Sequence, residues 1–125
     1  GAGGTGIVII RRLTGIYGNL TLQSTDTAAE AVPTKADMVM LMEDSLGTAT
    51  ENTDIKGFVS RDSGVTFIEG TLVDEGDWGT NKRILAFHDL SFTGASGTAM
   101  CYKITTHNQS ASIQTKIHAT SIGWK

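Results

Sequence analysis

Short stretches in which apolar and polar residues alternate recur along most of the chain. In ADMVMLMED, Met38, Met40 and Met42 fall on one face of an extended strand, and NKRILAFHDL and TAMCYKITTHN repeat the same period. Such alternation is typical of β-strands, in which successive side chains point to opposite faces. The pattern predicts eight short strands, in GIVIIRRL, NLTLQS, ADMVMLMED, DIKGFVSRD, GVTFIEGTLV, NKRILAFHDL, TAMCYKITTHN and ASIQTKIHATSIGW.

Residues that favour turns separate these segments, in DSLGT, RDSGV, DEGDWGT, TGASGT and NQSA. Helix signals are scarce, because the best candidate, TDTAAEAV at 25–32, meets Pro33 within about two turns. Short strands separated by turns at intervals of about ten residues indicate a sandwich or a barrel. We therefore expect an all-β fold, an antiparallel β-sandwich of about eight strands that resembles a jelly roll.

Two of the expected strands are apolar on both faces. In DMVMLME the residues between the methionines are also apolar, and RILAFH has apolar residues on both sides. An antiparallel sheet with one face in water would alternate cleanly between apolar and polar residues. Either a loop of the same chain or a neighbouring subunit therefore covers the outer face. The candidate subunit contacts are Met38, Met40, Met42, Ile84 and Ala86.

The composition is that of one globular domain. The 125 residues carry a net charge of −3, which argues against binding to nucleic acid or to an anionic membrane surface. No apolar run is long enough to predict insertion into a membrane. The chain holds one cysteine, Cys101, so an intrachain disulfide is excluded. We assign 19–125 to the β-sandwich module and 1–18 to the first strand and the end of a glycine-rich linker.

The stretch SRDSGVTF at 60–67 fits the pattern Ser-x-Asp-x-Gly-x-Thr-aromatic, the "Asp box" of sialidases and other β-propellers. Its residues suit a hairpin: Asp62 can accept bonds from turn amides, and Gly64 can take a positive φ. Thr66 and Phe67 would begin the next strand, with the aromatic ring packed inward. A propeller needs several blades of four strands, more than this chain can supply. We interpret the motif as a structural turn.

Catalytic and metal-binding patterns are weak. GAGGTG matches a dinucleotide fingerprint, but a strand rather than a helix follows the glycines, so no cofactor is expected. Cys101 and His107 would lie at opposite ends of one strand, too far apart for a catalytic dyad. The three histidines lack the spacing of metal ligands, and no Gly-x-Ser-x-Gly elbow occurs. These observations predict no enzymatic activity and no metal.

The segment DEGDWGT combines three carboxylates, two glycines and a tryptophan. The alternating acids of a dedicated calcium loop are missing. Trp78 could stack on a sugar with Asp77 bonding its hydroxyls, or it could lie over the sheet in an ordinary polar hairpin. The candidate contacts for a host cell-surface glycan are Asp74, Asp77 and Trp78, because loops on a rigid scaffold often carry binding.

Five blocks of the chain resemble a module found near the ends of tail fibres and related structural proteins of tailed bacteriophages. They are PTKADMVMLMED, GTATENTDIKGFVSRDSGVTF, LVDEGDWGTNKRILAFHDL, SGTAMCYKITTHNQSAS and IHATSIGW. The leading GGTGIVIIRR is similar to the end of the glycine-rich segments of such fibres. Phe67 departs from the Trp that is usual in the Asp box, but it keeps the aromatic contact. The resemblance carries over no catalytic residue.

The resemblance implies an extracellular virion component of the host-attachment apparatus. Such a module would form a homotrimer, contact other virion proteins and help to build or anchor a tail fibre. Two alternatives stay open. A carbohydrate-binding module would be a monomer with an exposed, essential Trp78. A subunit of an extracellular filament would add its GIVII strand to the sheet of a neighbour.

Overall fold

The computed structural model describes residues 6–8 and 18–125 of the chain. Within these residues it contains ten β-strands and no helix. The strands are β1 (Gly6–Val8), β2 (Thr21–Gln23), β3 (Thr27–Ala28), β4 (Lys35–Leu46), β5 (Ile55–Ser60), β6 (Ile68–Gly70), β7 (Val73–Gly79), β8 (Lys82–Ser91), β9 (Ala99–Thr106) and β10 (Gln114–Trp124). The weak helix candidate at 25–32 contains β3, as the all-β prediction requires. One local prediction is wrong, because most of the expected loop at 74–80 belongs to β7.

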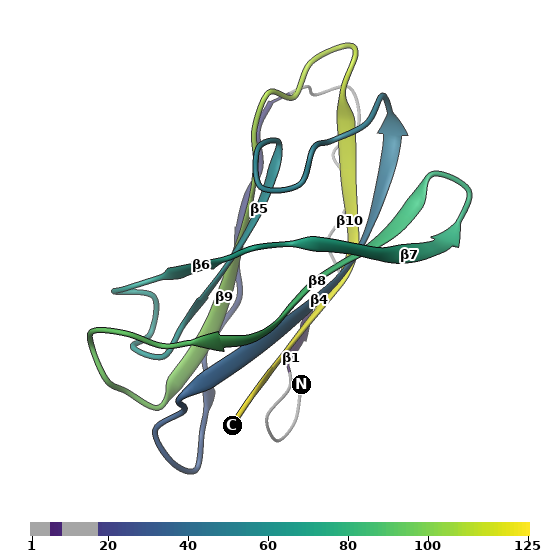
Figure 1. Cartoon of the computed structure of the whole chain (residues 1–125). Helices are drawn as coiled ribbons and strands as arrows, with labels where there is room; N and C mark the ends of the chain where they lie inside the picture. The colour runs from purple at the N-terminus through teal and green to yellow at the C-terminus, as the bar shows by residue number, and fades with distance from the viewer. Residues whose placement is uncertain (1–5, 9–17) are drawn as a thin grey trace.

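The strands form two antiparallel sheets that pack face to face (Figure 1). Sheet A has the order β1-β10-β4-β8-β7, and sheet B has the order β2-β9-β5-β6, with β3 also paired to β9. The pairs β1–β10, β2–β9, β4–β8 and β5–β6 are nested, as in one long hairpin folded over on itself. This arrangement, with eight strands in the nested set, is that of a jelly roll and confirms the predicted fold class.

The space between the sheets holds the hydrophobic core. Met38, Met40 and Met42 point into it from β4, and each is 0% exposed. Tyr102 and Ile104 of β9 close the core from sheet B. Burying large apolar side chains is the main favourable term in folding, worth about 1.5–3 kcal/mol for each residue of this size. The methionine face of β4 is therefore the inner face of the sandwich.

Two glycines let the sheets approach closely. Gly57 and Gly70 lie opposite each other in the β5–β6 pair, on the inner face of sheet B. A Cβ atom on Gly70 would lie 2.3 Å from the Phe87 ring, and one on Gly57 would lie 2.8 Å from Met38 Sδ. A glycine inside a strand often marks such a close approach. Because glycine has no side chain, Phe87 and Met38 can occupy the space beside these two positions.

We expect Gly70→Ala to destabilise the protein by about 1–3 kcal/mol, because the added methyl group overpacks the core against Phe87. Urea unfolding monitored by circular dichroism measures the change. In a Phe87→Leu background the same substitution should cost less, since the ring that it meets is gone. An equal cost in both backgrounds would contradict this account of the packing.

Candidate interaction surfaces

The outer face of sheet A carries a contiguous apolar surface. One row across the sheet pairs Val39 of β4 with Ala86 of β8, and Ala86 with Val73 of β7. The next row pairs Leu41 with Ile84 of β8 and with Ala119 of β10. Val39 is 37% exposed and Val73 is 55% exposed. We call these six residues the apolar face: Val39, Leu41, Val73, Ile84, Ala86 and Ala119.

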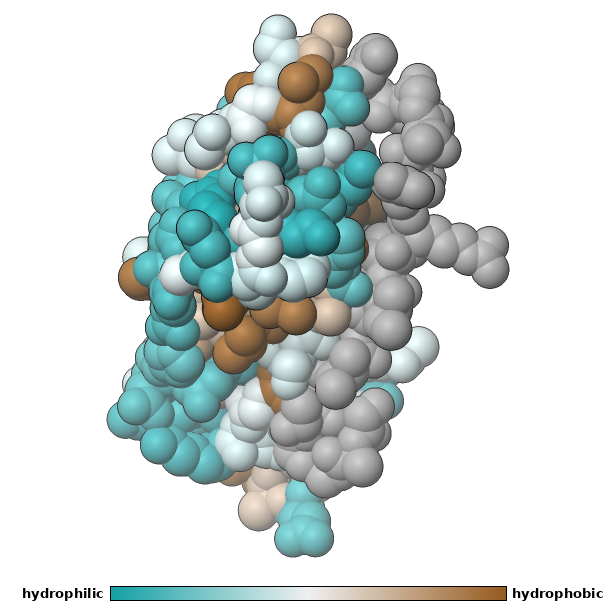
Figure 2. Space-filling view, turned by 90° about the vertical axis from the view of Figure 1, so that its right-hand side faces the viewer, coloured by the Kyte–Doolittle hydropathy of each residue, from teal (hydrophilic) through white to brown (hydrophobic). Residues whose placement is uncertain are grey.

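Charged residues border the apolar face at both ends. At one end Glu43 pairs in register with Lys82 and Lys116, and its Oε1 lies 2.7 Å from His118 Nε2. That hydrogen bond holds the pKa of Glu43 below its ordinary value. At the other end lies His88 of β8, whose Nε2 is 2.7 Å from Oε2 of Glu75. Glu75 follows Asp74, the partner of Leu85, so this contact crosses the row of Val73 and Ala86. Figure 2, which views the molecule from the side of β7, shows apolar atoms at its centre with hydrophilic atoms above and below.

The outer face of sheet B is more polar. Lys56, Lys103 and Thr105 point outward there from β5 and β9. Its aromatic residues, Phe58 and Phe67, contact each other edge to face, and the ammonium group of Lys103 lies 4.6 Å and 4.5 Å from their ring centres. A charged group thus caps the aromatic surface on this side. Of the two outer faces, sheet A offers the better apolar contact surface.

The β7 edge of sheet A is unsuited to pairing with another strand. Its pairing with β8 has two irregularities, and it carries the exposed acids Asp74, Glu75 and Asp77. Bulges and charged residues on an edge strand oppose the addition of a further strand. This edge is therefore less suited to contact with another chain than the face of sheet A is.

The structure holds Trp78 in place by several contacts. Its Nε1–H donates to the backbone oxygens of Met42 (3.2 Å) and Arg83 (3.1 Å). His118 packs edge to face on the ring at 5.0 Å, and Lys82 Nζ lies 5.0 Å from the ring centre. The ring is half-buried. Through these contacts Trp78 connects β7 to β4 and β10.

The other two candidates for glycan contact, Asp74 and Asp77, lie on the same strand as Trp78. Asp74 Oδ2 lies 3.5 Å from Arg83 Nη1, and Asp74 Oδ1 accepts a bond from the backbone N–H of Gly76. Asp77 is exposed and pairs in register with Arg83. All three candidates, Asp74, Asp77 and Trp78, thus lie beside Arg83, and their role as glycan contacts stays a prediction.

Arg83 organises one end of the sandwich, a role that the sequence reading missed. Its guanidinium makes a bidentate pair with Asp44 at 2.8 Å and 3.2 Å, contacts Glu51, and donates to the backbone oxygen of Ala49 at 2.7 Å. Burial opposes the charged form, yet Asp44 and Glu51 raise the pKa of Arg83. Arg83 lies two residues before Leu85 on β8, so its side chain points to the inner face of the sheet, as that of Leu85 does. A charged group on the inner face requires partners that are also buried.

The Asp box forms the turn between β5 and β6. Asp62 Oδ1 accepts bonds from Ser60 Oγ and from the backbone N–H of Thr66, and these hold the pKa of Asp62 below its ordinary value. Gly64 has a φ of +82°, which glycine tolerates. Phe67 lies against Phe58, whose side chain points away from the core, so the expected inward packing of Phe67 is wrong.

Several expected subunit contacts are not accessible. Met38, Met40 and Met42 fill the core, so their assignment as contacts is corrected. Ile84 and Ala86 do lie on the outer face, but Ala86 is 0% exposed. The sequence shows that β4 has two apolar faces, and the structure shows that the other face, with Val39 and Leu41, points outward.

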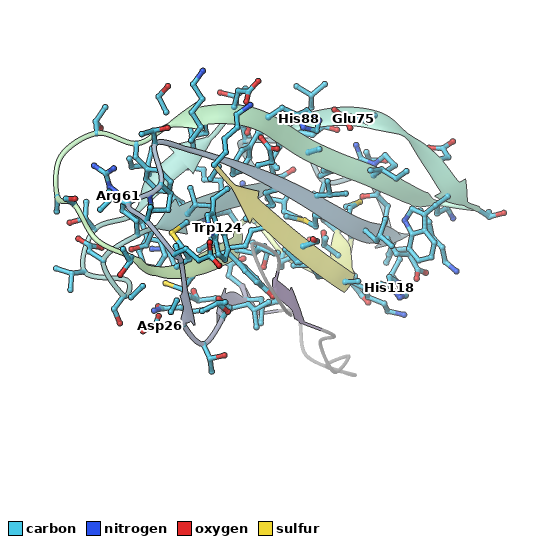
Figure 3. All side chains as sticks on the ribbon, turned by 90° about the horizontal axis from the view of Figure 1, so that it is seen from below. Asp26, Arg61, Glu75, His88, His118 and Trp124 are labelled. Atoms are coloured by element: carbon cyan, nitrogen blue, oxygen red, sulfur yellow. The ribbon has the colours of Figure 1, made fainter. Side chains whose placement is uncertain are left out.

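The three histidines have separate surroundings in the described structure. In Figure 3, His88 and Glu75 lie side by side, while His118 lies apart from them. His107 has its own partner, Thr105 Oγ1, at 2.8 Å. Within 6–8 and 18–125, no three His, Cys, Asp or Glu side chains are placed to hold a metal ion. Burial raises the pKa of Cys101 to about 11, which keeps its thiol protonated.

Comparison with protein-family models, with curated proteins and with solved structures finds no match to this chain. In the part of the chain that the structure describes, no helix is long and apolar enough to cross a membrane. The tail-fibre resemblance therefore stays a prediction. Any further argument about function rests on the geometry of the sandwich.

Asp54 joins two neighbouring loops at the end of the sandwich that also holds Arg83. Its Oδ2 accepts a bond from the backbone N–H of Thr50 at 2.9 Å, and its Oδ1 accepts one from Asn108 Nδ2 at 2.7 Å. These bonds favour the carboxylate and hold the pKa of Asp54 below its ordinary value, with Thr50 the larger cause. The folded state therefore takes up this proton at lower pH than the unfolded chain does.

We expect Asp54 to contribute stability above about pH 4 that is lost as the pH falls through its folded pKa. Asp54→Asn should lower the free energy of unfolding at pH 7, since the amide cannot accept both bonds. The two proteins should approach each other in stability at about pH 2. Urea unfolding across this range measures both curves, and a difference that does not change with pH would contradict the role of the carboxylate.

Proposed function

We propose that this chain is a structural module of a bacteriophage tail fibre that assembles with its own copies, as a trimer, and serves host attachment. The apolar face of sheet A is the observation that carries this proposal. It has the composition of a contact surface, with an apolar centre and a charged rim. The resemblance of the sequence blocks to fibre modules supplies the biological setting.

Contact with a neighbouring copy of the chain is the simplest explanation for the apolar face. Val39 of β4 and Val73 of β7 are exposed, so the described part of the chain leaves apolar surface open to solvent both at the centre of this face and at its β7 edge. Contiguous exposed apolar residues with a polar border are typical of protein contacts. Three copies arranged about an axis would bury these faces against each other, with the more polar sheet B turned outward.

The two alternatives receive less support. The carbohydrate-binding module predicted an exposed Trp78, whereas its N–H is bonded within the subunit and its ring is flanked by His118 and Lys82. The filament predicted that the first strand pairs with a neighbour. Instead, Gly6–Val8 pairs with β10 of the same chain.

Substitution of the apolar face tests the proposal. Light scattering should give wild-type protein a mass of three chains, and Val39→Glu should give the mass of one chain, because three buried carboxylates would meet at the contact. Val39 is already 37% exposed in the subunit, so the substitution should not prevent folding. Thr21→Glu places the same charge on an exposed position of β2 in sheet B and should leave the trimer intact.

A monomeric wild-type protein would contradict the assembly. So would a trimer that persists in Val39→Glu, because the contact would then lie elsewhere. Circular dichroism of each variant shows whether the sandwich is retained.

A further inference from the structure

A groove of about 550 Å³ lies at the end of the sandwich where β10 finishes. Trp124, the last residue of β10, forms one side together with Lys125. The segment 27–33 forms the other side, and it includes β3. Figure 3 views the molecule from this end, with Trp124 labelled near the middle. The volume is within the range of sites for small ligands, about 300–1,000 Å³.

The wall of the groove is held by hydrogen bonds at several points, although little of it is regular structure. The backbone N–H of Ala29 donates to Thr98 O at 2.8 Å, and Arg61 Nη1 donates to Pro33 O at 2.8 Å. Beyond the wall, the backbone N–H of Thr34 donates to Lys125 O at 2.9 Å. These bonds fix 29–34 against both sheets. A wall that is ordered before binding loses little conformational entropy when a ligand arrives.

The residues along the groove suit a saccharide. Trp124 is half-buried: it packs against the core, and it also lines the groove. Glu30 also lines the groove and is exposed, and Thr27 supplies a hydroxyl. A sugar ring has an apolar face that packs on an aromatic ring, and its hydroxyl groups donate to carboxylate and hydroxyl oxygens. The groove offers both kinds of contact.

Trp124 is better placed for this role than Trp78. The N–H of Trp78 already has two backbone acceptors, and the side chains of His118 and Lys82 lie against its ring. Trp124 lines an open groove instead, and the carboxylate of Glu30 lines the same groove. The contrast moves the candidate glycan contact from β7 to the end of the sandwich.

We infer that the groove between 27–33 and Trp124 binds a glycan, with a sugar ring stacked on Trp124 and its hydroxyls bonded to Glu30. The inference rests on the proposed function, because it gives the attachment module the surface with which it holds a host glycan. It does not involve the apolar face, so binding and assembly can fail separately.

Nuclear magnetic resonance of the two indole N–H groups tests the inference. The probes are glucose, galactose, mannose, rhamnose, N-acetylglucosamine, N-acetylgalactosamine and sialic acid, together with lactose and N,N′-diacetylchitobiose. We expect at least one probe to shift the Trp124 signal while the Trp78 signal stays in place. Trp78→Phe assigns the two signals and should retain binding.

Matched variants identify the contacts. Glu30→Gln should weaken the binding of that probe by about tenfold or more, the effect of losing a hydrogen bond to a charged acceptor. Glu69→Gln changes an exposed glutamate of β6 in sheet B and should leave the affinity unchanged. Trp124→Phe, which keeps an aromatic ring in the core, should also weaken binding.

The result that would overturn the inference is a Trp124 signal that none of these probes moves. An affinity equal in wild type and Glu30→Gln would also overturn it. The same titration on Val39→Glu separates the two proposals: binding by a chain that no longer assembles shows that the groove acts independently of the trimer.

Discussion

β4 has two apolar faces, and only one of them can lie in the core of the sandwich. The methionine face fills the space between the sheets, where Met38, Met40 and Met42 are fully buried. Val39 and Leu41 must then point outward, next to Ile84 of β8. The jelly-roll topology places β4 between β10 and β8, near the centre of sheet A, so its second apolar face becomes the centre of an outer surface. This constraint links the packing of the core to the proposed assembly.

The ends of the sandwich are organised by polar groups instead. Arg83 and Asp44 form a bidentate pair at one end, together with the Asp54 contacts between loops. At the other end Arg61 and the backbone bonds of 29–34 hold the groove wall. A buried charge requires such partners, since an unpaired one would cost several kcal/mol. The described structure thus separates the central apolar face from a groove at one end of the sandwich.

The strand pattern and the fold class could be predicted from the sequence because alternation with period two reports directly on strand faces. The choice between the two faces of β4 was harder, as both are apolar. A usable signal was present: Asp37 and Glu43 share the face of Val39, whereas only Asp44 shares the face of the methionines. A single buried carboxylate can be paired more easily than two, and here Arg83 pairs with Asp44.

Other features depend on tertiary contacts that no local pattern contains. β7 has the composition of a turn, yet it pairs with β8 because the hairpin and the Trp78 contacts hold it there. The segment 25–32 has weak helix signals, but Thr27 pairs with Met100 of β9 and Pro33 is held by Arg61. The groove beside Trp124 joins residues about ninety positions apart, so its existence could not be read from either segment.

The most direct measurement of the central claim is the reactivity of a cysteine placed on the apolar face. Cys101 is 0% exposed and burial raises its pKa to about 11, so it should stay silent toward a thiol reagent. In the assembled protein we expect Val39→Cys to react much more slowly than Thr21→Cys, which lies on the exposed side of sheet B. Equal and rapid labelling of both cysteines would show that the apolar face is open to solvent and would contradict the account.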